Sequence, residues 1–188
     1  MSLMLTFTSK DILNSTICIH GGQVAYTLHT TKDIRGRKVT TVAGSTPASI
    51  NWQKHYLEVG TQVLPVGEAK REAGDRLNSE KVWQWGDAEY DLHFSQDRWT
   101  AKKLSGVVVA FFFPYHTRTF HKSELAQVVL QNDLPPAEAT FLVLVFIYSE
   151  IRRQDEQRAS SAGTSAEAAS SAATSAGGVL RVPLFGLQ

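Results

Sequence analysis

The sequence predicts a mainly β domain in which a closed antiparallel barrel of about 10–12 strands surrounds a hydrophobic helix near the C-terminus. Short runs of alternating apolar and polar residues recur through residues 1–131. Turn residues separate these runs, and one later stretch, residues 141–148, is apolar throughout. Short strands in regular succession are typical of sandwiches and barrels rather than of βαβ units.

The individual strands are indicated by period-two alternation, which places one face on a core and the other toward water. β-branched and aromatic residues dominate these runs, as expected for a half-buried pleated surface. Gly21-Gly22 and Gly86-Asp87 each separate two runs at the spacing of a tight hairpin, and Gly36 fits a turn between two more. The clearest runs are Val24–Thr30, Lys38–Val42, Lys81–Trp85 and Tyr90–Phe94.

One run differs from the others because it does not alternate. Residues 107–113 are apolar at every position and end at Pro114. We therefore expect a strand that is covered on both faces and is ended or bent by the proline.

The central helix is expected at about residues 136–153. Pro136 and Glu138 suit a first helical turn, and Arg152 and Arg153 suit the C-terminal end of the helix dipole. A long buried strand is the alternative, because Val, Ile and Phe are abundant. A helix that is apolar on every side must be surrounded, and the rest of the chain offers mainly strands to surround it. An open sheet with the helix on one face would leave half of these side chains in water.

The domain is expected to span residues 1–156, followed by a tail over residues 157–188. Ser, Ala, Thr and Gly dominate this tail up to Gly178 and offer few apolar groups to offset the entropy of ordering. We therefore predict a disordered tail that ends in a short apolar segment, residues 179–188.

Composition narrows the class of protein. The formal net charge is +1, so no field of one sign exists to attract nucleic acid. The single cysteine, Cys18, cannot form an internal disulfide. Residues 1–7 do not resemble a signal peptide, and no apolar run reaches the roughly 20 residues of a membrane span. We expect a cytoplasmic protein, with the nucleus or a membrane surface as alternatives.

No motif in the sequence predicts catalysis, a metal or a cofactor. The chain lacks the glycine-rich nucleotide-binding patterns and the nucleophile elbow of α/β-hydrolases. The tryptophans are expected to pack in the core, with a ligand cavity that they line as the alternative. The histidines have no metal-ligand spacing and are expected at polar strand positions: His20, His29, His55, His93, His116 and His121.

One cluster of cations is a candidate ligand site. A phosphate group is bound where several cations converge on one patch. The densest local group lies around the turn at Gly36, with Asp33 in its middle as a source of opposing charge. A solvated loop is the alternative interpretation of this cluster. The candidate ligand-binding residues are Lys32, Arg35, Arg37 and Lys38.

Several segments together carry a family resemblance: Tyr26–Thr30, Val39–Val42, Ala48–Trp52, Trp83–Trp85, Tyr90–Leu92, Phe141–Tyr148 and Glu150–Arg153. Over about residues 3–153 they resemble a family of domains of unknown function from mushroom-forming fungi. That family is similar to the tubby-like superfamily, which includes tubby C-terminal domains, LURP-one proteins and phospholipid scramblases. The resemblance implies a barrel of about twelve strands around a C-terminal hydrophobic helix.

The resemblance implies less about function. Tubby domains bind phosphoinositide head groups through basic side chains on the barrel wall, but that constellation has no residue-by-residue match here. An acidic calcium loop of the scramblase type is also missing from the sequence. The sequence predicts a non-enzymatic binding module for anionic membrane lipid or for another protein. An enzyme with an unrecognised site in the barrel mouth and a purely structural protein-interaction domain remain open as alternatives.

Overall fold

The computed structural model describes residues 2–34, 36–73, 80–116 and 123–174. The chain divides into two units, residues 1–150 and residues 151–188. Within the described residues, the first unit contains one sheet of 13 strands, a short helix, and the first part of a long helix.

All pairings in the sheet are antiparallel. Within each half of the chain, strands that are consecutive in sequence pair with each other, so β1–β7 form one meander and β8–β13 form another. The strands are β1 Ser2–Phe7, β2 Thr16–Ile19, β3 Val24–Asp33, β4 Gly36–Ala43, β5 Ala48–Asn51, β6 Tyr56–Val59, β7 Gln62–Pro65, β8 Lys70–Ala73, β9 Glu80–Trp85, β10 Ala88–Ser95, β11 Arg98–Lys103, β12 Val108–Phe113 and β13 Gln127–Gln131.

One long-range pairing joins the two meanders. β1 pairs with β13 over five residue pairs, from Ser2 opposite Gln131 to Thr6 opposite Gln127. The predicted hairpin turns are confirmed, because Gly21 and Gly22 have φ of 100° and 86° and Gly86 has φ of 57°. Glycine adopts such left-handed conformations without the steric cost that a Cβ would bring.

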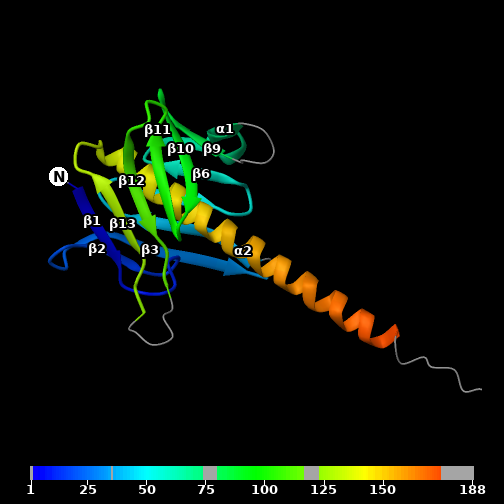
Figure 1. Cartoon of the computed structure of the whole chain (residues 1–188). Helices are drawn as coiled ribbons and strands as arrows, with labels where there is room; N and C mark the ends of the chain where they lie inside the picture. Colours follow the sequence, from blue (N-terminus) through cyan, green and yellow to red (C-terminus); the bar gives the residue numbers. More distant parts are fainter. Residues whose placement is uncertain (1, 35, 74–79, 117–122, 175–188) are drawn as a thin grey trace, which may run out of the picture. The chain divides into compact units, whose positions relative to one another are not determined.

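The central helix, α2, begins at Pro136, as the sequence predicts, and residues 136–150 belong to the first unit. Every residue from Thr140 to Glu150 is buried. In Figure 1 this part of α2 runs between strands of the two meanders. The expected fold class is confirmed: a mainly β, antiparallel, barrel-like sheet with a hydrophobic C-terminal helix.

Contacts on several sides show that the sheet encircles the helix. The Thr140 hydroxyl lies 3.3 Å from the Tyr26 hydroxyl of β3. Phe141 and Phe146 instead contact rings of β9, β10 and β12. Because an α-helix turns by about 100° per residue, positions 140, 141 and 146 face directions roughly 100–140° apart. Strands therefore lie on all sides of the apolar stretch.

Closure of the barrel differs from the expectation at one seam. The strand order ends at β7 on one side and β8 on the other, and in the described residues no pairing joins these two strands. The short helix α1, Val66–Ala69, connects them and contacts β7, β8 and β9. Its residues Val66 and Ala69 are buried. The seam is thus covered by a helical turn rather than by a ladder of hydrogen bonds.

The second unit contains the rest of α2, where helical backbone continues to Thr174. Helical backbone thus extends past the expected helix end at residue 153, and the disordered tail over residues 157–188 stays a prediction. Alanine has the highest helix propensity of all residues, and extending an existing helix avoids the cost of a new nucleus. Residues 175–188, with the apolar end of the predicted tail, lie outside the described residues.

The apolar run on β12 is not covered equally on its two faces. Phe112 is fully buried, whereas Phe111 and Phe113 are half-buried. The rings of Phe111 and Phe113 lie 6.3 Å apart, and the Arg98 guanidinium lies 5.1 Å from the Phe111 ring. The outer face of this strand is thus shielded in part by an arginine. The strand ends at Phe113, directly before the proline that was expected to end it.

Candidate functional site

The end of the β3–β4 hairpin brings the predicted cations together. Lys32 on β3 lies directly opposite Arg37 on β4, and Lys38 follows on the same strand. The register of the two strands shifts between Thr31 and Lys32, directly before this pair. Lys32 and Lys38 are exposed, whereas Arg37 is half-buried. Arg35, the fourth predicted residue, lies outside the described residues.

Two polar residues of the hairpin end contact the loop that follows β5. The Arg37 guanidinium lies 5.3 Å from the centroid of the Trp52 ring, a cation–π contact. The Asp33 carboxylate accepts a hydrogen bond of 2.9 Å from Gln53. Asp33, which looked in the sequence like a source of opposing charge, therefore takes part in holding the hairpin.

Trp52 also packs against the central helix. Its ring is stacked on that of Tyr148, with centroids 5.5 Å apart and an interplanar angle of 10°. Trp83 meets Tyr148 edge-on at 5.8 Å. The predicted core role is confirmed for Trp83 and Trp99, which are buried. Trp52 and Trp85 are half-buried and stack on helix rings.

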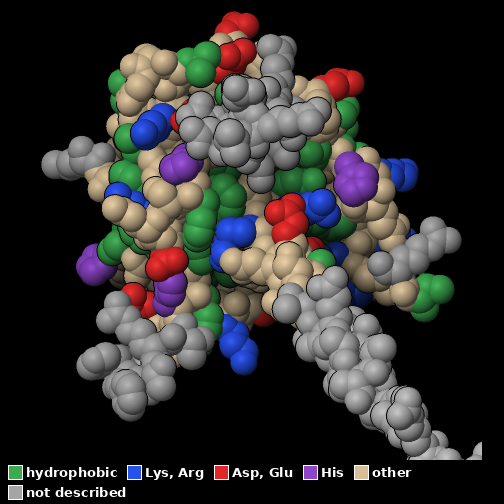
Figure 2. Space-filling view, turned by 45° about the vertical axis from the view of Figure 1, so that its right-hand side comes forward, with side chains coloured by type: hydrophobic (Ala, Val, Ile, Leu, Met, Phe, Trp, Pro, Cys, Tyr) green, Lys and Arg blue, Asp and Glu red, His purple; other side chains and the backbone are tan. Residues whose placement is uncertain are grey.

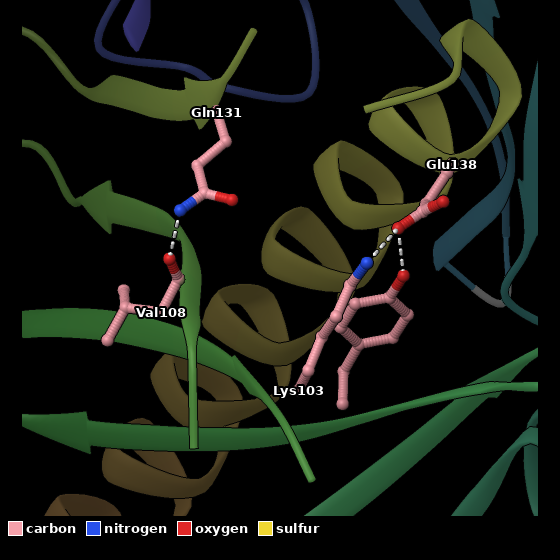
Figure 3. Close-up of polar contacts among 5 residues, drawn as sticks. Lys103, Val108, Gln131 and Glu138 are labelled. Atoms are coloured by element: carbon pink, nitrogen blue, oxygen red, sulfur yellow. Dashed lines mark hydrogen bonds and ion pairs between the residues drawn. The ribbon is translucent and has the colours of Figure 1, made fainter. Parts of the chain in front are cut away.

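A polar cluster lies around the first turn of α2. Tyr90 on β10 donates a hydrogen bond to the Glu138 carboxylate. The Lys103 ammonium lies 3.6 Å from the same carboxylate, and the two side chains are 42% and 11% exposed. Figure 3 shows Lys103 and Glu138 in contact, with Gln131 bonded to the Val108 carbonyl nearby. The sequence indicated the helix-start role of Glu138 but gave no sign of its two partners, which are far away in the chain.

The environment of Tyr90 predicts a specific loss of stability at high pH. Burial, helped by the hydrogen bond to Glu138 and its negative charge, raises the pKa of Tyr90 well above the usual value of about 10. As the pH rises, the unfolded chain therefore loses the Tyr90 proton before the folded chain does. The stability that Tyr90 contributes is fully present below about pH 10 and is lost as the pH rises further. We expect Tyr90→Phe to lower the unfolding free energy at pH 7 by about 1–3 kcal/mol and to flatten its decline above pH 10. Urea unfolding at pH 7–11 measures both effects, and parallel curves would contradict the prediction.

A second buried carboxylate lies near the end of the first unit. Glu150 is 1% exposed and accepts a hydrogen bond of 2.9 Å from the Trp99 indole. A buried carboxylate needs such donors, because desolvation otherwise penalises its charge. Trp99 and Glu150 therefore form a polar contact between β11 and α2 inside an apolar core.

A shallow hollow of about 370 Å³ lies on the outer face of β4, β5 and β6. It contains one carboxylate, Glu58, which accepts a hydrogen bond of 3.0 Å from the Ser49 hydroxyl. Among the described residues, no group of three or more His, Cys, Asp or Glu side chains could hold a metal ion. His121 lies outside that part of the chain.

The surface charge is mixed. On the face seen in Figure 2, Lys and Arg side chains are interspersed with Asp and Glu rather than gathered into one field. Screening limits long-range attraction by such a surface to about 8–10 Å. Any anion would therefore be held by a local group of cations. In the described part of the chain, no helix has both the length and the hydropathy that crossing a bilayer requires.

Comparisons with known proteins add little to this geometry. No protein-family profile matches the chain, and no curated protein matches it. Among solved structures, the chain is similar to the X-ray structure of a protein from Arabidopsis thaliana, with 12% identity and a TM-score of 0.46. The match covers 80% of this chain and 91% of the plant protein. At this level of similarity, no function carries over to the chain.

Proposed function

We propose that this protein is a non-catalytic binding module that recognises the phosphate groups of anionic phospholipid head groups at the end of the β3–β4 hairpin. The observation that carries the proposal is that two exposed lysines, Lys32 and Lys38, lie at the hairpin end, where Lys32 is paired with Arg37. Cations that two paired strands bring to one hairpin end are suited to a phosphate group, whose oxygens accept several charge-assisted hydrogen bonds. The resemblance to the tubby-like superfamily suggests the class of ligand, because tubby domains bind phosphoinositide head groups, but it does not indicate these residues.

The filled interior supports recognition at the surface. Large side chains from the sheet and from the helix are fully buried together, among them Trp83, Tyr90, Phe112, Phe141 and Phe146. Ligand pockets of enzymes are usually concave sites with convergent polar groups. The hollow on β4–β6 is shallow and holds a single carboxylate, which suits a phosphate poorly. The hairpin end instead combines exposure with positive charge.

Flotation with phosphoinositide-containing liposomes tests this function. Each lysine near an anionic membrane surface contributes about 1 kcal/mol, so we expect Lys32→Ala/Lys38→Ala to lower the partition coefficient about thirtyfold. These two lysines are chosen because replacing Arg37 would also remove its contact with Trp52.

The matched control is Lys10→Ala/Lys102→Ala, which removes the same charge from two exposed lysines elsewhere. This control should bind almost like the natural sequence. The proposal is wrong if the protein floats no better with anionic than with neutral liposomes. It is also wrong if the two double variants lose binding equally, because net charge rather than the hairpin would then explain it.

A further inference from the structure

Arg37 differs from its neighbours on the hairpin end. Among the described residues from 31 to 38, it is the one side chain that is not exposed. Its guanidinium lies over the Trp52 ring at 5.3 Å, and the Trp52 amide donates a hydrogen bond of 3.0 Å to the Lys38 carbonyl. The loop after β5 thus supports the hairpin end that carries the exposed lysines, through both side-chain and backbone contacts.

Trp52 is itself fixed by a chain of hydrogen bonds. Its indole N–H donates to the Thr40 hydroxyl at 2.8 Å, and the Thr40 and Thr30 hydroxyls lie 2.7 Å apart. The Thr30 hydroxyl donates to the Leu13 carbonyl at 2.9 Å. An indole N–H can only donate and a carbonyl can only accept, so every hydroxyl in this chain has a defined role. Together with the stack on Tyr148, these bonds make Trp52 a rigid support.

We propose that Arg37 is a positioning residue, which acts through Trp52 to hold the hairpin end so that Lys32 and Lys38 face one ligand together. This inference rests on the proposed function, and it assigns Arg37 a role different from the direct ligand contact that the sequence predicts. Holding the lysines in place reduces the entropy lost when a phosphate group immobilises them. The hydrogen bond between Asp33 and Gln53 supports the same segment from the other strand.

Replacing Trp52, the uncharged partner of Arg37, distinguishes a positioning role of Arg37 from direct contact with the ligand. We expect Trp52→Leu to lower partition into phosphoinositide liposomes about two- to fivefold, the range for losing an exposed cation–π contact, although no charge is removed. Trp52→Phe keeps an aromatic face for Arg37 and should restore most of the binding. Arg37→Ala/Trp52→Leu should bind no worse than Arg37→Ala alone, because each change breaks the same contact between Arg37 and Trp52. Trp85→Leu is the control, because Trp85 is also half-buried but stacks on Phe141.

Hydrogen exchange of the amides in residues 30–40 tests positioning without any ligand. Arg37→Ala and Trp52→Leu should both accelerate this exchange, whereas Trp85→Leu should leave it unchanged. Normal exchange in Arg37→Ala would overturn the inference, even if liposome binding fails altogether. Normal binding by Trp52→Leu, together with loss of binding by Lys32→Ala/Lys38→Ala, would also overturn it while leaving the proposed function intact.

Discussion

Phe146→Asp is expected to abolish the cooperative thermal unfolding transition, because the folded state should no longer be populated at 25 °C. Phe146 is fully buried in the part of α2 that the strands surround, and its ring is stacked on Phe112 with centroids 5.8 Å apart. Removing a buried phenylalanine ring costs about 3–5 kcal/mol. A carboxylate left there without a partner adds several more. The total stability of a domain is about 5–15 kcal/mol, so this single change removes most or all of it.

Phe113→Asp is the matched control, with the same substitution on the outer face of the sheet. Phe113 is half-buried on β12, so an aspartate there can reach water. We expect a loss of about 1–2 kcal/mol and a cooperative transition shifted down by roughly 2–8 °C. Circular dichroism melting curves of the two variants give the comparison. A Phe146→Asp protein that melts within a few degrees of the natural sequence would contradict the encircled helix.

Trp83→Ala is expected to produce the next largest loss, about 3–5 kcal/mol of unfolding free energy. Trp83 is 1% exposed and bridges two turns of α2, meeting Phe141 at 6.5 Å and Tyr148 at 5.8 Å. Alanine would leave a cavity against the helix, where the surrounding strands and helix can collapse only in part.

Trp83→Phe should cost much less, about 1 kcal/mol, for a reason specific to this site. The Trp83 indole N–H is buried and has no hydrogen-bond partner in the described part of the chain. Leaving such a donor unsatisfied costs about 1–3 kcal/mol, so removing it offsets part of the packing lost with the larger ring. Urea unfolding of both variants measures the difference. Equal losses of unfolding free energy in Trp83→Phe and Trp83→Ala would contradict this prediction, because the phenylalanine ring would then contribute nothing to stability.

The helix was predictable because its composition leaves few alternatives. Eight consecutive apolar residues at 141–148, with Pro136 and Glu138 before them, can be satisfied only inside a surrounding layer. The end of α2 was not predictable in the same way, because no residue after Arg153 opposes helix strongly before Gly163. A serine-alanine tract has no apolar face that packing could act on, so propensity and continuation from the existing helix decide its state.

The candidate site was predictable in its members but not in their roles. Local sequence brings Lys32, Arg37 and Lys38 together around a turn, which any hairpin would do. The contact of Arg37 with Trp52 depends on how β4 and β5 pair, and nothing in the local sequence indicates it. The half-exposed outer face of β12 was missed for a similar reason, since an apolar run does not say what covers it.

The position of the central helix in the chain has a consequence for biosynthesis. Residues 136–150 follow all of the strands in sequence, and β1 finds its second neighbour only when β13 has been made. During synthesis from the N-terminus, the strands are therefore complete before the helix that fills their core, and their apolar inner faces stay uncovered until residues 136–150 emerge. The order of the elements thus leaves these apolar faces exposed for longest during synthesis, when they are open to aggregation or to binding by chaperones.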